Sequence, residues 1–212
     1  MSRYIGALLR GVAGINSRPM SSANRAQTTS ILERLAAALA GGRPELMETK
    51  SRRRAAVALL LRERGLGLEI LVIKRSENER DPWSGHMALP GGGREPGEES
   101  AYDTARRETL EEVGIDLSAG RYLGRLDDVG PRNMPGQLII STVVVEIDAE
   151  PGSLDEREVM EAFWVPVDRL VEETVEIPDF PGSWPAFTYK NRYVIWGLTH
   201  RILMQLWSLI PS

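Results

Sequence analysis

The chain has 212 residues, a length typical of one ordinary domain with a short extension, and its 42% hydrophobic content supplies a core and excludes global disorder. Its net charge of −4 excludes a protein that coats nucleic acid, because such a protein needs a strongly basic surface. There is no cysteine and there are only two histidines, so any metal site must use carboxylate oxygens and a hard cation.

The N-terminal part is basic, because residues 1–32 contain no acidic residue and arginines recur among serines and small apolar residues. We expect residues 1–27 to be a disordered leader, or an over-extended start with Met20 as the true first residue. The same composition is typical of a mitochondrial transit peptide. Because we favour the first interpretation, we expect a cytoplasmic protein. A mitochondrial location is the alternative if the segment is a transit peptide.

Local patterns predict alternating helices and strands. A short amphipathic helix is expected over 31–40, since apolar residues recur at helical spacing behind a capping-box pair. The run Leu-Pro-Gly-Gly-Gly at 89–93 is expected to form neither helix nor regular strand. The other predicted elements are strands over 55–61, 68–74, 137–147, 161–167 and 189–195, and helices over 100–113 and 196–209. This order predicts an α+β or α/β sandwich.

The helix over 100–113 carries three glutamates on one face. Glu108, Glu111 and Glu112 stand at i, i+3 and i+4, and no lysine lies between residues 95 and 115. Like charges at these spacings repel, which favours a divalent cation, and oxygen ligands indicate Mg²⁺ or Mn²⁺. The alternative is a solvated acidic helix face. Together with the glycine run, which lets a ligand approach the backbone, the pattern indicates metal-dependent chemistry on a phosphorylated substrate.

The segment 93–115 resembles the signature of Nudix hydrolases. Ile115 fills the last apolar position of that signature, and Thr109 departs from it by standing where an apolar residue is usual. The resemblance implies a single domain over 28–212, with a Nudix α/β/α sandwich of about residues 50–210, a mixed β-sheet and a loop–helix–loop. The seven fixed positions are occupied by Gly93, Glu99, Arg107, Glu108, Glu111, Glu112 and Gly114.

The resemblance also implies the chemistry: a diphosphatase that uses Mg²⁺, or Mn²⁺, to cleave a nucleoside diphosphate linked to another group. Glu108, in addition to binding metal, would help to activate the water. Arg107 and Glu99 would orient the loop and the helix. The implied catalytic residues are Glu108, Glu111 and Glu112, and the implied metal ligands are these three, the carbonyl of Gly92 and, from outside the signature, Glu158.

The surroundings of the signature are most similar to coenzyme A pyrophosphatases, in which an Arg-Ser pair precedes Gly-Gln-apolar-small-Phe-Pro-Gly-Gly. Here Arg75-Ser76 precedes residues 85–92, with His86 in place of glutamine and Leu89 in place of phenylalanine. This resemblance implies cleavage of coenzyme A or acyl-coenzyme A to 3′,5′-ADP and phosphopantetheine or its acyl form. The alternatives are an ADP-ribose or dinucleotide pyrophosphatase and a non-catalytic nucleotide-sensing module.

Three further residues are candidates for substrate binding: Arg75, His86 and Arg132. The expected partner is a small nucleotide substrate, with no nucleic acid and no membrane. We also allow for a homodimer.

Overall fold

A computed structural model of the chain describes residues 30–47, 53–65, 67–78, 83–131 and 137–210. The leader expected over 1–27 and the candidate Arg132 lie outside these ranges. In chain order the elements are α2 (Ile31–Gly41), β1 (Arg53–Arg64), β2 (Gly67–Arg75), β3 (Met87–Ala88), β4 (Gly91–Gly93), α3 (Ala101–Val113), β5 (Arg121–Arg125), β6 (Leu138–Glu146), β7 (Val159–Pro166), β8 (Val171–Ile177), β9 (Phe180–Tyr189), β10 (Tyr193–Trp196) and α4 (Gly197–Leu209).

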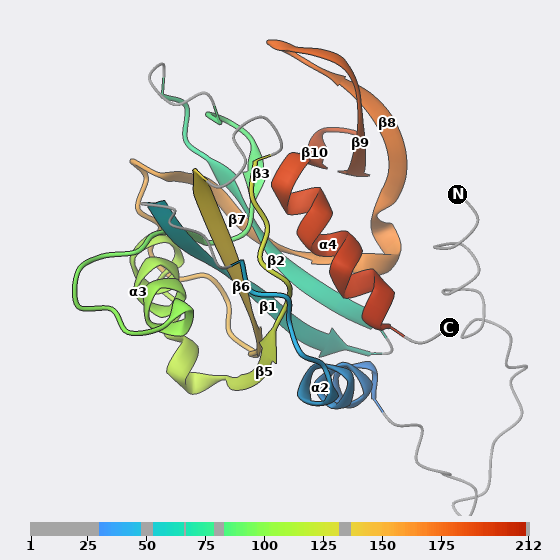
Figure 1. Ribbon diagram of the computed structural model, residues 1–212. Helices are drawn as coiled ribbons and strands as arrows, with labels where there is room; N and C mark the ends of the chain where they lie inside the picture. Colours follow the sequence, from blue (N-terminus) through green and yellow to red (C-terminus); the bar gives the residue numbers. More distant parts are fainter. Residues whose placement is uncertain (1–29, 48–52, 66, 79–82, 132–136, 211–212) are drawn as a thin grey trace, which may run out of the picture.

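Strand β1 is the centre of a seven-stranded mixed sheet (Figure 1). Along one side it runs parallel to β6, which in turn pairs with β5. Along the other side, its first half pairs with β4 and its second half with β2, both antiparallel. Strands β3 and β7 add to β2. The sheet therefore divides beside β1, where β2 ends and β4 begins.

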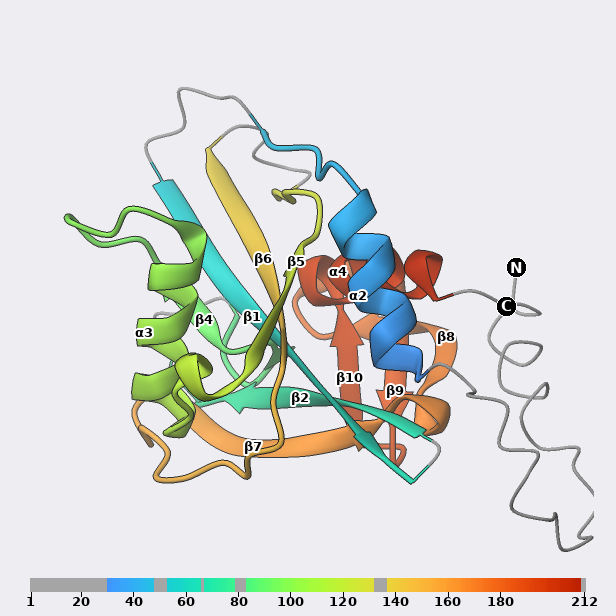
Figure 2. The ribbon, with the colours of Figure 1, turned by 90° about the horizontal axis from the view of Figure 1, so that it is seen from below.

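Helices cover both faces of this sheet, with α3 on one side and α2 and α4 on the other (Figure 2). Side chains of β1 alternate between the two layers, as strand geometry requires. Leu59 and Leu61 join the core beneath α2 and α4, whereas Ala58 and Leu60 join the core beneath α3. This arrangement confirms the predicted α/β/α sandwich with a mixed sheet. None of the described helices is long and apolar enough to cross a membrane.

A second, three-stranded antiparallel sheet, β8–β9–β10, lies beside α4 (Figure 1). Phe187 of β9 is fully buried and packs its ring 4.8 Å from His200 and 5.0 Å from Trp207, both in α4. These contacts fix the second sheet against the last helix.

The structure corrects several local predictions. The glycine run contains a short strand, β4, where no regular strand was expected. The strand predicted over 189–195 is interrupted by a hairpin turn, with positive φ at Lys190 and Asn191, between β9 and β10. Strands β5, β8 and most of β9 were not predicted. Strand β8 shows why, because three of its seven residues are glutamates, two of them adjacent, and its side chains are largely exposed, so it carries little hydrophobic signal.

Candidate active site

Helix α3 carries the glutamates, and local signals set its ends. Ser100 begins it with a capping box, in which the hydroxyl accepts from the N–H of Asp103 at 3.2 Å and the carboxylate of Asp103 accepts from the N–H of Ser100 at 2.8 Å. Gly114 ends it with a φ of 69°, a left-handed conformation that suits glycine. Thr109 is fully buried, and its hydroxyl has no hydrogen-bond partner in the described part of the chain. The signature glutamates therefore occupy the last two turns of a well-defined helix.

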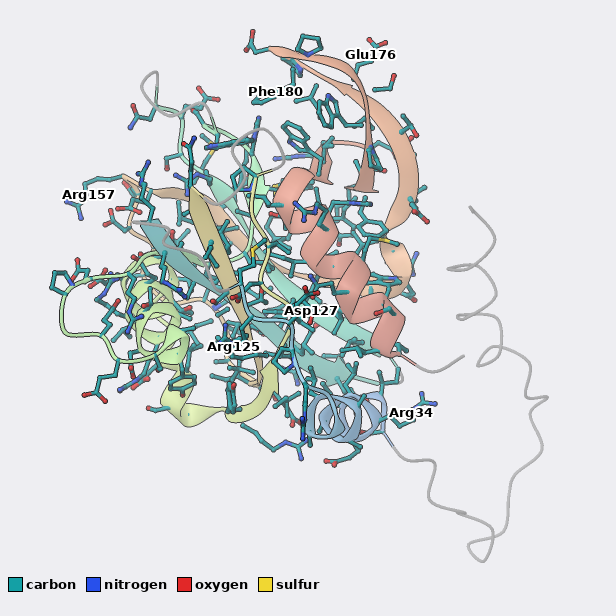
Figure 3. All side chains as sticks on the ribbon, in the orientation of Figure 1. Arg34, Arg125, Asp127, Arg157, Glu176 and Phe180 are labelled. Atoms are coloured by element: carbon teal, nitrogen blue, oxygen red, sulfur yellow. The ribbon has the colours of Figure 1, made fainter. Side chains whose placement is uncertain are left out.

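Three carboxylates converge on one point. Glu108 and Glu112 of α3 and Glu158, which precedes β7, each place a carboxylate oxygen within 4.8 Å of the other two. We call these three residues the carboxylate cluster. The backbone directly after β2 holds the third member in place, because the N–H of Ser76 donates to the carbonyl of Glu158 at 2.8 Å. Figure 3 labels Arg157 in the turn that carries Glu158.

Burial acts on the two carboxylates of the cluster that come from α3. Burial raises the pKa of Glu112, which is only 2% exposed, to about 8, and the charges of Glu108 and Glu158 act in the same direction. Burial likewise raises the pKa of Glu108, against the effect of the adjacent Arg107. Crowded, desolvated carboxylates of this kind favour a cation, which would replace the protons.

The glycine strand β4 lies directly against the cluster. The N–H of Gly91 donates to the carboxylate of Glu112 at 2.8 Å. A Cβ on Gly92 would lie 2.5 Å from the carboxylate of Glu108, and a Cβ on Gly91 would lie 2.3 Å from the carbonyl oxygen of Ala56. Only residues without a side chain allow β1, β4 and α3 to approach this closely.

Arg107 ties the loop to the helix. Its guanidinium donates to the carboxylate of Glu98 at 2.8 Å, to the carbonyl of Gly93 at 2.9 Å and to the carboxylate of Glu111 at 3.1 Å, and lies 2.9 Å from Glu108. Although partial burial acts in the opposite direction, the hydrogen bonds to Glu98 and Glu108 raise the pKa of Arg107. Arg107 therefore remains charged and holds Glu108 beside β4, as the expected orienting role requires. Glu111 lies outside the carboxylate cluster and pairs with Arg107.

The orienting glutamate is Glu98, not Glu99 as expected. Glu98 accepts from the hydroxyl of Thr104 at 2.6 Å as well as from Arg107, and these bonds lower its pKa although burial alone would raise it. Glu99 is exposed and makes no contact with Arg107. Gly97, with a φ of 96°, turns the loop so that Glu98 points inward. In the sequence, the glycine directly before Glu98 was the signal that could have identified this glutamate as the partner of Arg107.

The two described candidates for substrate binding, Arg75 and His86, lie in different surroundings. Arg75, at the end of β2, contributes a positive charge that lowers the pKa of Glu112, so it lies beside the cluster. His86 lies among aromatic side chains, with its ring 5.2 Å from that of Trp196. The two residues are linked through the backbone, since the N–H of Arg75 donates to the carbonyl of His86 at 3.0 Å.

The chain is similar to a known protein family and to several individual proteins. The model of the NUDIX domain family matches residues 51–183 of this chain. Two proteins of Schizosaccharomyces pombe are similar: the probable nudix hydrolase C6G9.05, 30% identical over 74% of this chain and 56% of that protein, and the uncharacterized protein C14C4.10c, 44% identical over 48% of this chain and 33% of that protein. The chain thus spans between a third and just over half of these relatives. A MutT/nudix family protein from Enterococcus faecalis has a similar solved structure, with 21% identity, a TM-score of 0.48, and coverage of 84% of this chain and 68% of that one.

Proposed function

The chain belongs to the Nudix family, and from this premise we propose that it is a divalent-metal-dependent diphosphatase that cleaves the diphosphate linkage of a nucleoside diphosphate derivative. The observation that carries the proposal is the carboxylate cluster of Glu108, Glu112 and Glu158. An acidic helix face that served only for solubility would be hydrated, whereas Glu112 is buried and Glu108 is half-buried.

The residues present fit Mg²⁺ or Mn²⁺, because the cluster offers only hard oxygen donors and because burial, which raises the pKa of Glu108 and Glu112, disfavours their charged forms unless a cation is near. We propose the three cluster residues as ligands and, as the family resemblance implies, the carbonyl of Gly92 and the carboxylate of Glu111 as further ligands, which requires Glu111 to leave its ion pair with Arg107. When bound, the cation would supply the positive charge that stabilises the diphosphate as its P–O bond breaks.

Side chains of this protein carry out the proton transfer and orient the reacting groups. Glu108 is the proposed general base: it accepts the proton of the water that attacks phosphorus, while the bridging oxygen leaves with the other phosphate. Burial raises the pKa of Glu108, which makes its carboxylate a stronger base. Arg107 fixes the orientation of Glu108, and Arg75 lies where it can meet the negative charge of the substrate.

We further propose that the substrate is coenzyme A or an acyl-coenzyme A, cleaved to 3′,5′-ADP and phosphopantetheine or its acyl form. Two features support this choice. The Arg75-Ser76 element that resembles coenzyme A pyrophosphatases borders the carboxylate cluster, through the charge of Arg75 and the backbone of Ser76. In addition, a cavity of about 1000 Å³ is lined by residues from Lys74 to Met87 and from Glu176 to Trp196, and it has room for the part of a long substrate that lies beyond the diphosphate.

The test is a substrate panel with Mg²⁺, comprising coenzyme A, ADP-ribose, NADH and diadenosine polyphosphates, with products separated by chromatography. We expect release of 3′,5′-ADP from coenzyme A. Preference for ADP-ribose or a dinucleotide would overturn the coenzyme A proposal and keep the diphosphatase. Binding of nucleotides without hydrolysis of any would overturn the enzyme and favour a sensing module.

The residue assignment is tested by Glu112→Gln, which keeps the size of the side chain and removes its charge. We expect turnover to fall by about 100-fold or more, because the cluster loses a carboxylate. Glu156→Gln is the matched control, since Glu156 is exposed and lies outside the cluster. Unchanged turnover in Glu112→Gln, with the fold intact by circular dichroism, would contradict the assignment.

A further inference from the structure

A group of aromatic side chains lies between the second sheet and the start of α4. Phe180 of β9 is in contact with two indoles, with ring centroids 5.5 Å from Trp83 and 4.8 Å from Trp196. Trp184 lies 5.6 Å from Trp196 on the other side. Figure 3 shows Phe180 at the β8–β9 hairpin, above the start of α4.

These rings border a cavity of about 300 Å³, which we call the aromatic pocket. This volume is at the lower end of the range for ligand sites, so it suits one arm of a substrate and not a whole nucleotide. The other lining residues are Pro131, Pro185, Gly197, Leu198, His200 and Arg201.

The aromatic pocket offers few groups for hydrogen bonding. The indole N–H of Trp184 donates to the carbonyl of Phe180 at 3.3 Å, and the guanidinium of Arg201 donates to the carbonyl of Gly130 at 2.7 Å. The buried Nε2 of His200 has no hydrogen-bond partner among the residues described. Apart from this one nitrogen, a polar ligand group placed here would find little to replace its hydrogen bonds to water. The lining therefore favours an apolar ligand.

The arrangement of the rings argues against a nucleobase. Trp83 and Phe180 are the most nearly parallel pair in the group, with an interplanar angle of 26°, and at 5.5 Å they already stack on each other. Trp196 meets Phe180 at 70°, edge to face. No pair in the described group leaves a parallel slot for a third ring. A flexible aliphatic chain needs no such slot, since contact with ring faces and edges is sufficient.

The aromatic pocket adjoins a larger cavity that begins at Lys74, the residue before Arg75 in β2. The larger cavity shares Phe180 and Trp196 with the aromatic pocket. That larger cavity is also lined by His86, whose carbonyl accepts the N–H of Arg75 beside the carboxylate cluster. A long substrate with its diphosphate at the cluster would have to pass the end of β2 to enter the larger cavity, and its far end would then lie among the aromatic rings.

We propose that the aromatic pocket is a specificity site for the unbranched aliphatic end of the substrate, a chain of the acyl thioester class. The proposal rests on the diphosphatase function above and adds to it a preference for chain length. A substrate with no aliphatic arm would leave this pocket without a ligand.

The first experiment measures kcat/KM for coenzyme A and for its acetyl, butyryl, hexanoyl and decanoyl thioesters. We expect kcat/KM to rise by about threefold for each methylene that enters the pocket and then to level off. In Phe180→Asp the ratio of hexanoyl to acetyl should fall towards one, whereas Phe180→Leu, which keeps an apolar side chain at the same place, should retain most of it. A wild-type ratio near one, or the same ratio in both variants, would overturn the proposal.

A second experiment needs no hydrolysis. Hexanoyl-pantetheine, which has no diphosphate, should change the tryptophan fluorescence of the wild type and of Phe180→Leu, but not of Phe180→Asp. If this probe binds while no diphosphate is cleaved, the diphosphatase proposal fails and the pocket stands. If coenzyme A is cleaved but the probe does not bind, the pocket assignment fails. It also fails if the probe binds but adenosine displaces it from the aromatic rings.

Discussion

At the scale of single residues, the site depends on which of two adjacent glutamates meets Arg107. The carboxylate of Glu98 is mostly buried and bonded to both Arg107 and Thr104, whereas Glu99 faces solvent. We predict that Glu98→Gln lowers the free energy of unfolding by about 2 kcal/mol, because it weakens a buried charge-assisted hydrogen bond, and that it lowers kcat by releasing Glu108. Urea unfolding and steady-state kinetics measure the two effects.

Glu99→Gln is the matched control for this prediction, with the same change one residue later in the chain. We expect it to leave stability within about 0.5 kcal/mol of the wild type, as exposed substitutions usually do. A larger effect for Glu99→Gln than for Glu98→Gln would show that the position given by the signature, and not the contact seen in the structure, identifies the orienting residue.

At the scale of elements, strand β4 is built of glycine because it lies between β1 and the carboxylates of α3. We predict that Gly92→Ala lowers activity by about 10-fold or more and weakens Mn²⁺ binding, since its methyl would lie 2.5 Å from the carboxylate of Glu108 and displace it. Gly93→Ala is the control, because a Cβ there has no neighbour within 4 Å. Isothermal titration with Mn²⁺ measures the binding. Equal effects of the two substitutions would contradict the role of close approach.

Elements differ in how far the sequence predicts them. Helix α3 was predicted within one residue because its capping box and its terminal glycine are local signals. Strands β5 and β8 escaped prediction because neither carries an apolar run: β5 has only five residues with an arginine at each end, and β8 has three glutamates among seven largely exposed residues. The cluster shows the same division: Glu108 and Glu112 follow from helical spacing, whereas Glu158 joins them only through the tertiary contact between β2 and the turn before β7.

At the scale of the whole molecule, the two helical layers and the divided sheet place the site. Strand β1 pairs first with β4 and then with β2, so the sheet opens where α3 presents its last turn. The same division separates the carboxylate cluster, on the α3 side, from the aromatic pocket beside α4. The proposed acyl substrate would therefore have to pass the edge of the sheet to contact both regions.

The stability of the whole protein should depend on pH and metal together. Glu112 has a pKa of about 8 in the folded protein and 4.5 as an ordinary glutamate. Between these values the folded protein holds a proton that the unfolded chain has released, so in the presence of EDTA the free energy of unfolding should fall as pH rises from about 5 to 8, by at most about 1.4 kcal/mol per pH unit. Saturating Mg²⁺ or Mn²⁺ binds the deprotonated cluster and should stabilise the protein more at pH 8 than at pH 5.

Urea unfolding at both pH values measures these two effects. The variant Glu112→Gln should remove the part of the pH dependence that comes from Glu112. A slope in EDTA that is unchanged by Glu112→Gln would contradict the raised pKa of Glu112.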